Sequence, residues 1–455
     1  MTKFDYPRSI AIQALSLILD QDKFSNDVLK GLLTDPNLTN LDRKFVTALV
    51  YGVLDYLPLI DQIIIKASRR SSSKIDSEIM NILRLGVWQL LFAEKIPRSS
   101  AVDESVKLAI RFNKRSAGGF INGVLRNVIR NPLKLTKKQE HLKYGMSSEI
   151  FGMYKKWFGE EGARSVSQSY LSADKNLTVL YRGPITEKQN WISELKKIGI
   201  TVKPGILVYN SFFLQNLPTG VQDLPGYQQG LFYVQDESSM LVAEVMQVQR
   251  NQIILDACAG LGGKSFSLLQ QNPHLEIIAL EPNQERYQGL LDNINRLKIN
   301  QIKDLKTDLQ SFVTNYAEKR YFDQILLDVP CSGLGVLRHK PEIKRNLSFA
   351  KLQEFPVIQM DLLNHAALLT STTGKLLYST CTINPAENEQ LIAGFLESEA
   401  GQKYTIVDIS YVLDKIRPDY KAELRAGLTA YGLSIRPDII PVDGFFISYL
   451  KRKTE

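Results

Sequence analysis

Three cysteines are the residues of this 455-residue chain that most favour covalent chemistry. Cys258, Cys331 and Cys381 are too few and too far apart in the chain for a disulfide framework. The four histidines do not cluster with them at the spacing of a zinc site, so we expect no metal. Any special role of these thiols is therefore chemical. Cys258 stands among small residues, where a free cysteine usually serves as a small buried apolar side chain.

Cys331 and Cys381 each follow a predicted strand. Cys331 lies in the segment Asp328-Val-Pro-Cys-Ser-Gly-Leu-Gly335, and Cys381 lies between two threonines. A thiolate that adds to carbon 6 of a pyrimidine turns the ring into an enamine, whose carbon 5 then attacks a methyl sulfonium. This reaction needs a nucleophile, a base for the carbon 5 proton and an acid near ring nitrogen 3. Two cysteines and Asp328 fit these roles, although either cysteine taken singly is explained equally well by packing.

A glycine-rich turn, Asp256-Ala-Cys-Ala-Gly-Leu-Gly-Gly-Lys-Ser265, is predicted between a strand and a helix. Backbone N–H groups approach a ligand at such a turn, and the helix N-terminus favours an anionic group. A phosphate-binding Walker loop needs glycine six residues before Lys264, where this chain has Cys258, so the pattern argues against a nucleotide triphosphatase. Glu281, at the tip of the next strand, is placed to bind the ribose hydroxyls of an adenosine-containing cofactor, and the alternative is a solvent-exposed glutamate.

The elements that position these residues alternate between apolar strands and helix-length segments. The strands are predicted at 252–256, 277–281, 322–328 and 374–380. Such a pattern predicts a parallel sheet covered on both faces, and ligands bind beyond the carboxyl ends of its strands. We therefore expect the four strand tips, and with them the glycine turn and both cysteine segments, to form one site.

The first third of the chain predicts a helical bundle, because apolar residues recur at helical spacing from Ser9 to Asn131. Breaks are expected at 35–37, 69–73 and 96–98. Gly118, Gly119 and Gly123 are expected to allow close contact between helices.

Basic charge is concentrated in the same region. The net charge is +8, and residues 1–150 carry 23 lysines and arginines against 15 acidic residues, so they hold the whole excess. This density favours binding to a polyanion, and the alternative is a solvated helical face. The basic residues that we single out are Lys107, Arg111, Lys114, Arg115, Arg126 and Arg130.

Three domains are predicted: a helical domain at 1–140, a small α+β module at 141–230 and an α/β domain at 231–455. The module is expected from a strand at 177–181 and a helix at 187–198. No stretch has the length and apolarity of a membrane span, and residues 1–16 lack the features of a secretion signal. We expect a cytoplasmic protein that does not bind membranes, with a monomer favoured.

These motifs resemble the bacterial 16S ribosomal RNA cytosine-5 methyltransferases of the RsmB/Sun/Fmu type. The resemblance covers nearly the whole chain and includes segments 101–109 and 120–127, which are similar to the NusB antitermination factor, and the segment 234–243. It implies a NusB-like all-α domain that binds RNA, a small intermediate α+β domain and a Rossmann-like methyltransferase domain. The implied activity is methylation of carbon 5 of a specific cytosine in small-subunit ribosomal RNA with S-adenosyl-L-methionine, through a covalent cysteine adduct at carbon 6.

The resemblance also assigns roles to residues. It implies that Cys381 is the nucleophile, that Cys331 assists product release and that Asp328 lies between cofactor and base. The choice of Cys381 over Cys331 rests on the resemblance alone. The cofactor residues that it implies are Cys258, Ala259, Gly260, Leu261, Gly262, Gly263, Lys264, Glu281, Asp308 and Asp328.

This chain departs from the family pattern at two places. The family usually has Ala-Pro where Gly260-Leu261 stand, and Asp where Glu281 stands. Two other functions remain open from the sequence. One is an amine- or protein-directed methyltransferase on the same scaffold, and the other is a non-catalytic RNA-binding factor.

Overall fold

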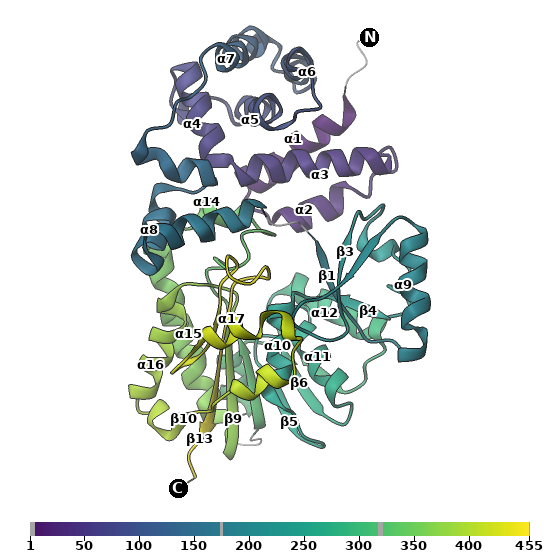
Figure 1. Cartoon of the computed structure of the whole chain (residues 1–455), viewed down its shortest axis with the longest axis vertical. Helices are drawn as coiled ribbons and strands as arrows, with labels where there is room; N and C mark the ends of the chain where they lie inside the picture. Colours follow the sequence, from purple (N-terminus) through teal and green to yellow (C-terminus); the bar gives the residue numbers. More distant parts are fainter. Residues whose placement is uncertain (1–4, 173–175, 317–321, 455) are drawn as a thin grey trace. The chain divides into compact units, whose positions relative to one another are not determined.

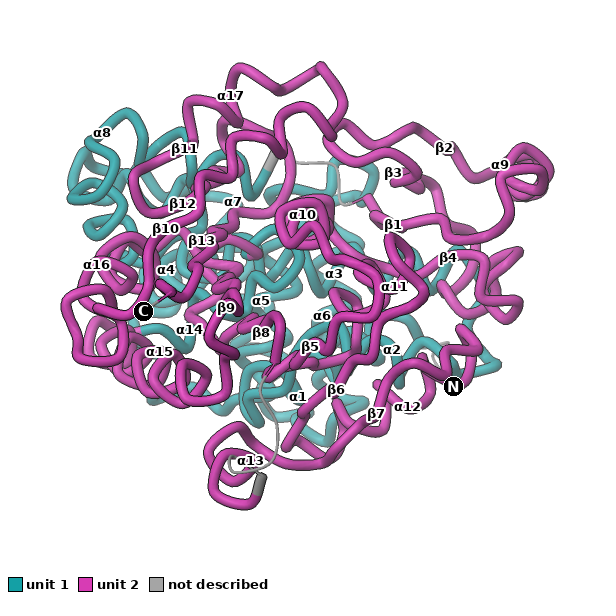
Figure 2. The backbone as a smooth tube through the Cα atoms, turned by 90° about the horizontal axis from the view of Figure 1, so that it is seen from below, with its two compact units in different colours: residues 1–172, 337–347 teal, residues 173–336, 348–455 magenta. Residues whose placement is uncertain are grey.

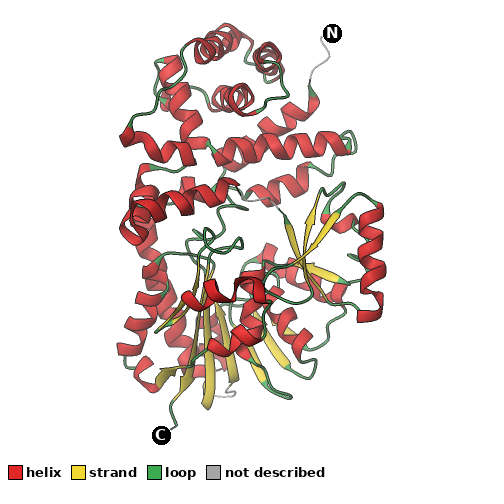
Figure 3. Cartoon of the chain, viewed as in Figure 1, coloured by secondary structure: helices red, strands yellow, loops and turns green. Residues whose placement is uncertain are grey.

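The computed structural model describes residues 5–172, 176–316 and 322–454. The chain forms two compact units, which Figure 2 colours separately: residues 1–172 with 337–347, and residues 173–336 with 348–455. In the described residues the first unit contains helices only, and both sheets belong to the second (Figure 3). The domain borders expected at 140 and 230 stay a prediction.

The helical unit carries the bundle that the apolar spacing predicts, with breaks at the three predicted places. Its helices are α1 Tyr6–Asp20, α2 Ser25–Leu32, α3 Asn40–Asp55, α4 Leu57–Ser68, α5 Ser77–Phe92, α6 Arg98–Arg111, α7 Gly118–Arg130, α8 Ser148–Ser172 and α14 Ile343–Asn346 (Figure 1). Side-chain caps begin several of them: Thr39 and Asp42 form a capping box on α3, and Asp76 accepts from the first turn of α5.

Of the three glycines expected to allow close helix contacts, Gly118 is the one that is buried, and the structure shows a closer approach at Gly52. A Cβ on Gly52 would lie 2.1 Å from the Trp88 ring, so the absence of a side chain lets α3 and α5 pack together. Gly118 is buried, but Gly119 and Gly123 are exposed and a Cβ on either would meet no atom within 4 Å. The packing role predicted for Gly119 and Gly123 is therefore wrong.

In the described residues no single helix is long and apolar enough to cross a membrane. The helices α3 and α4 together have the length and apolar composition of a membrane span, but the chain bends by 77° between them. Their apolar side chains belong to the core of the helical unit.

The small module of the second unit is an antiparallel sheet in the order β2-β3-β1-β4, covered by one helix. Trp191 on the helix contacts the rings of Tyr181, Phe212 and Phe232 in the sheet. Its elements are β1 Leu177–Tyr181, α9 Lys188–Lys197, β2 Thr201–Pro204, β3 Ser211–Gln215 and β4 Phe232–Val234. The strand and the helix predicted here are confirmed.

The large sheet has the order β11-β12-β13-β9-β8-β5-β6-β7, and β10 pairs with β13. Its strands are β5 Ile253–Asp256, β6 Glu276–Leu280, β7 Ile302–Leu305, β8 Phe322–Asp328, β9 Thr370–Thr380, β10 Tyr404–Ile406, β11 Leu428–Thr429, β12 Gly432–Ile435 and β13 Phe445–Arg452. The neighbouring strands β9, β8, β5, β6 and β7 are parallel as predicted. The strands β10, β11, β12 and β13 add an antiparallel part, so the sheet is mixed.

Helices cover both faces of this sheet. Alternate strand residues serve the two faces: Leu326 packs with α10, α11 and α12, and Leu327 packs with α13, α15 and α16. The helices are α10 Glu237–Met246, α11 Gly263–Gln271, α12 Gln284–Leu297, α13 Leu309–Tyr316, α15 Phe349–Leu369, α16 Glu389–Glu397 and α17 Lys421–Ala426. The chain runs outward from β5 through β6 to β7 and then returns to β8 on the other side of β5. The strand order therefore reverses between β5 and β8, which is where open α/β sheets bind ligands.

Candidate active site

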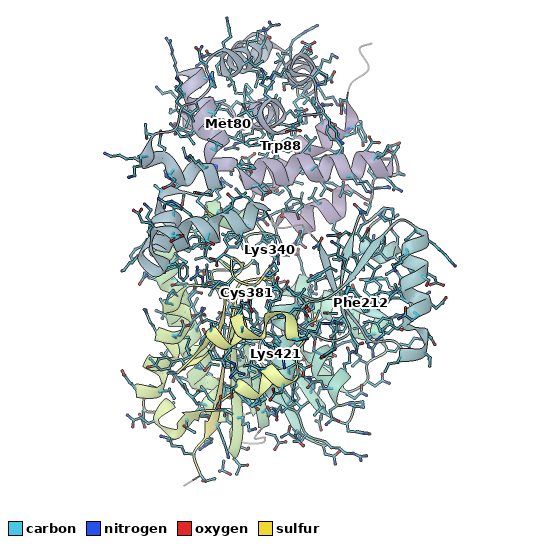
Figure 4. All side chains as sticks on the ribbon, viewed as in Figure 1. Met80, Trp88, Phe212, Lys340, Cys381 and Lys421 are labelled. Atoms are coloured by element: carbon cyan, nitrogen blue, oxygen red, sulfur yellow. The ribbon has the colours of Figure 1, made fainter. Side chains whose placement is uncertain are left out.

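The residues singled out in the sequence gather at the carboxyl ends of β5, β6, β8 and β9. Pairing of β8 with β9 places Asp328 beside Ser379, so the two following loops leave the sheet at the same edge. Figure 4 labels Cys381 at this edge. The convergence of the strand tips is a consequence of parallel pairing, because all four strands end on one side.

The glycine turn after β5 has two left-handed residues. Gly262 has φ +90°, and a Cβ there would lie 2.3 Å from the Phe266 ring, so only glycine fits. Gly260 has φ +57°, but a Cβ there would meet no atom within 4 Å. The backbone of Gly260 is thus open to a ligand, and a glycine adopts this conformation without strain. Leu261 is exposed, and its carbonyl accepts a hydrogen bond from Asn293.

Glu281 lies just beyond β6 and is buried against this turn. Its Oε2 accepts from the Gly260 N–H at 3.0 Å, and its Oε1 accepts from the Asn283 N–H at 2.8 Å. These bonds orient the carboxylate and leave further lone pairs for hydroxyl groups. The side chain of Glu281, which is one methylene longer than the aspartate usual in the family, therefore reaches the glycine turn from the end of β6.

At the start of the turn, Asp256 is buried and Cys258 is half-buried. Asp256 accepts from Ser265 Oγ at 2.6 Å, and burial raises the pKa of its carboxyl to about 6. Burial also raises the pKa of the Cys258 thiol. A thiol with a raised pKa is a poor nucleophile at neutral pH, which supports the expectation that the sulfur of Cys258 has a packing role.

Asp328 ends β8 and is held from two sides. Lys264 Nζ lies 2.5 Å from Asp328 Oδ2, and Ser379 Oγ donates to Asp328 Oδ1 at 2.9 Å. The ion pair joins the glycine turn to the end of β8, where the loop that carries Cys331 begins. Asp308, by contrast, caps the start of α13 through hydrogen bonds from the N–H and Oγ of Ser311, which lower the pKa of the Asp308 carboxyl.

The two cysteine sulfurs lie 3.3 Å apart, and both residues are half-buried. Backbone contacts hold the loops together: the Gly335 N–H donates to the Cys381 carbonyl at 3.0 Å, and a Cβ on Gly335 would lie 2.0 Å from the Gly444 carbonyl oxygen. The hydrogen bond with Cys381 and burial raise the pKa of Cys331 well above its ordinary value. The protonated form of Cys331 is therefore favoured, and its S–H can donate a hydrogen bond to the sulfur of Cys381.

Comparisons with known proteins match both parts of the chain. Residues 243–451 match the family model of the 16S rRNA methyltransferase RsmB/F, and residues 6–130 match that of the NusB family. The ribosomal RNA small subunit methyltransferase B of Proteus mirabilis is 30% identical over 402 residues, which is 86% of this chain and 91% of that protein.

The chain belongs to the RsmB/F methyltransferase family.

The similarity to RsmB/F proteins extends over the full length. A probable ribosomal RNA small subunit methyltransferase B from Bacillus subtilis is 28% identical and covers 98% of each chain. Among solved structures, PH0851 has a TM-score of 0.83 at 21% identity and covers 98% of this chain and 99% of its own. The structure of NSun6 from Pyrococcus horikoshii with SFG has a TM-score of 0.57 at 18% identity and covers 67% of this chain and 98% of its own. These structures show the fold.

In this RsmB/F family member, three polar residues of the site were missed in the sequence. Ser379 precedes Cys381 by two residues and bonds Asp328, while Gln359 on α15 and Glu387 after the Cys381 loop bond the backbone around Cys331. Glu387 stands in the acidic run Glu387-Asn-Glu, but nothing in that run distinguishes the buried Glu387 from its neighbour Glu389. Gln359 has no local signal, because only tertiary packing brings α15 to the loops.

Proposed function

We propose that this chain transfers a methyl group from S-adenosyl-L-methionine to carbon 5 of a specific cytosine in 16S ribosomal RNA, through a covalent adduct between Cys381 and carbon 6. The observation that carries the proposal is the pair of sulfurs 3.3 Å apart, in the two loops that follow the paired strand ends at Asp328 and Ser379. Membership of the RsmB/F family supports ribosomal RNA as the substrate.

The glycine turn fits the proposed cofactor. Gly260 has room for a ligand above its backbone, and Glu281 keeps lone pairs for both ribose hydroxyls. The cofactor supplies an electrophilic methyl sulfonium when bound. The residues proposed to hold it are Cys258, Ala259, Gly260, Leu261, Gly262, Gly263, Lys264, Glu281, Asp308 and Asp328.

The two thiols divide the proposed reaction. The Cys381 thiol gives its proton to the Asp328 carboxylate, which passes it to ring nitrogen 3, while the sulfur forms a bond to carbon 6 and carbon 5 becomes nucleophilic. After carbon 5 has gained its methyl group, a base removes the carbon 5 proton. The electron pair of that C–H bond then restores the ring double bond and expels Cys381, and nitrogen 3 returns its proton. Cys331, 3.3 Å from Cys381, is placed to assist this release.

RNA binding is proposed for the helical unit. Lys107 and Lys114, two of the basic residues singled out in the sequence, form ion pairs with acidic side chains of that unit. Arg115, Arg126 and Arg130 are exposed at and along α7. We therefore propose α7 as the element that contacts phosphates, and its arginines are suited to bidentate contacts.

Incubation of the protein with 16S ribosomal RNA and S-adenosyl-L-methionine, followed by digestion to nucleosides and mass spectrometry, tests the proposal. We expect 5-methylcytosine from the wild-type chain and none from Cys381→Ala. N-methylated nucleosides would contradict the proposal and favour an amine-directed methyltransferase. Absence of cofactor binding by calorimetry would favour a non-catalytic RNA-binding factor.

A further inference from the structure

The carboxylate of Glu387 is completely buried and accepts four hydrogen bonds. Its Oε2 accepts from the Ser332 N–H at 2.9 Å and from Gln359 Nε2 at 3.0 Å. Its Oε1 accepts from Ser332 Oγ at 2.5 Å and from Asn384 Nδ2 at 2.8 Å. Four donors on one carboxylate is a high number for a group that lies outside the reacting centre, and it offsets the free-energy cost of burying the charge.

The four donors come from both sides of the thiol pair. Ser332 directly follows Cys331, and its hydroxyl also lies 2.8 Å from the hydroxyl of Thr382, which directly follows Cys381. Gln359 donates a second hydrogen bond, at 3.0 Å, to the carbonyl of Pro330, which precedes Cys331. The residues on either side of Cys331 are thus fixed, by a network centred on Glu387 that also includes the loop of Cys381.

An acceptor with two oxygens is needed at this position. A glutamine in place of Glu387 would present its NH₂ group either to the Ser332 N–H or to the Asn384 amide nitrogen. Neither donor has freedom to turn, because the Ser332 N–H is backbone and the Asn384 Oδ1 already accepts from the Ala386 N–H. One buried donor would then lose its partner, which the backbone relieves only by moving a loop.

We propose that Glu387 is a positioning residue that sets the separation of the two cysteine loops, and so holds Cys331 beside the attacking Cys381. The proposal rests on the proposed function for the roles of the two thiols. Glu387 accepts hydrogen bonds from Ser332, Gln359 and Asn384, so it acts on the two cysteines through the loops that carry them.

The charge of Glu387 has a second, measurable effect. Together with the stronger contact with Cys381, the Glu387 carboxylate raises the pKa of the Cys331 thiol. Removal of this negative charge is therefore expected to let Cys331 ionise at a lower pH. A residue that contributed only to folding would leave the pH dependence of Cys331 unchanged.

The experiment compares Glu387→Gln with Glu389→Gln in the full-length protein. Glu389 accepts from Ser434 Oγ on β12, so the control makes the same chemical change two residues away. Turnover is measured with 16S ribosomal RNA. Alkylation of Cys331 by iodoacetamide is measured against pH, without RNA or cofactor, by peptide mass spectrometry. For Glu387→Gln we expect kcat to fall about 10²-fold at unchanged KM for RNA, and alkylation of Cys331 to begin at lower pH. The control should match the wild-type chain in both.

A wild-type kcat and a wild-type alkylation profile in Glu387→Gln would overturn the proposal. If this variant loses its thermal transition, Gln359→Met replaces it, because that change removes both hydrogen bonds of the amide and keeps the carboxylate. We then expect kcat to fall about tenfold at unchanged KM, and a wild-type kcat would overturn the proposal. A wild-type chain that makes no 5-methylcytosine would refute the proposed function instead. The alkylation profile would still decide whether Glu387 acts on the thiols.

Discussion

Lys264 and Asp328 form an ion pair, with Nζ 2.5 Å from Oδ2, that links the first turn of α11 to the carboxyl end of β8. Lys264 belongs to the proposed binding site of the cofactor, and Asp328 is proposed to lie between the cofactor and the cytosine ring. Ser379 Oγ holds the other oxygen of Asp328, so the direction of this carboxylate is set before any substrate binds. Preorganisation of this kind reduces the cost of aligning reacting groups.

Replacement of Lys264 by methionine should therefore slow the chemical step. Without the ammonium group Asp328 keeps one of its two side-chain partners, and we expect kcat to fall about 10- to 10²-fold with folding retained. Steady-state kinetics with 16S ribosomal RNA tests this, with Lys303→Met, on the exposed face of β7, as the matched control. If kcat stayed at the wild-type level and only the KM for S-adenosyl-L-methionine rose, the role of Lys264 would be cofactor binding alone.

The two cysteines should give opposite results when each is replaced. Cys331→Ala leaves the attacking sulfur in place and removes the group proposed to assist release, so a protein–RNA adduct should accumulate and survive denaturing electrophoresis. Cys381→Ala should give no adduct, and neither should the double variant. An adduct in Cys381→Ala that disappears in the double variant would show that the roles of the two cysteines are reversed.

Alanine at the two left-handed glycines should have unequal effects on stability. At Gly262 the added Cβ meets the Phe266 ring at 2.3 Å and Leu290 at 2.6 Å, so we expect Gly262→Ala to lower the free energy of unfolding by about 2 to 4 kcal/mol. At Gly260 only the backbone strain applies, and the loss should be about 1 kcal/mol. Denaturant unfolding of both variants measures the difference. Equal losses would mean that the contact with Phe266 is relieved by local movement.

Asp256 should make the stability of the second unit depend on pH. Its folded-state pKa is raised to about 6 by burial, so its protonated form is favoured in the fold. The contribution of Asp256 to the free energy of unfolding is complete below its pKa in the unfolded chain, near 4. As pH rises through 6, the free energy of unfolding falls by about 2 to 3 kcal/mol. The melting temperature of the wild-type chain minus that of Asp256→Asn should therefore fall between pH 4 and pH 6 and be constant above pH 7. Parallel melting curves for the two proteins across this range would contradict the prediction.

Local patterns were sufficient for most of the fold. The helical spacing of residues 9–131 predicts the bundle, and the apolar strands with helix-length spacers predict the sheet whose tips form the site. The antiparallel strands β10, β11 and β12 were not predicted, because strands of two to four residues lack a distinctive pattern. Gly119 and Gly123 of α7 were misjudged, because the face of a helix that meets its neighbours is set by packing and small size alone does not reveal it.

The sequence by itself determined the candidate residues of the site, because residue type at a strand tip is a local property. The glycine turn, Glu281, Asp328 and the two cysteines were all identifiable as candidates. Tertiary structure decided their relations. Cys331 and Cys381 are fifty positions apart, and only the pairing of β8 with β9 brings their sulfurs to 3.3 Å. It also decided that the acid at 387 is buried between their loops, because burial depends on contacts with α15 that no local pattern encodes.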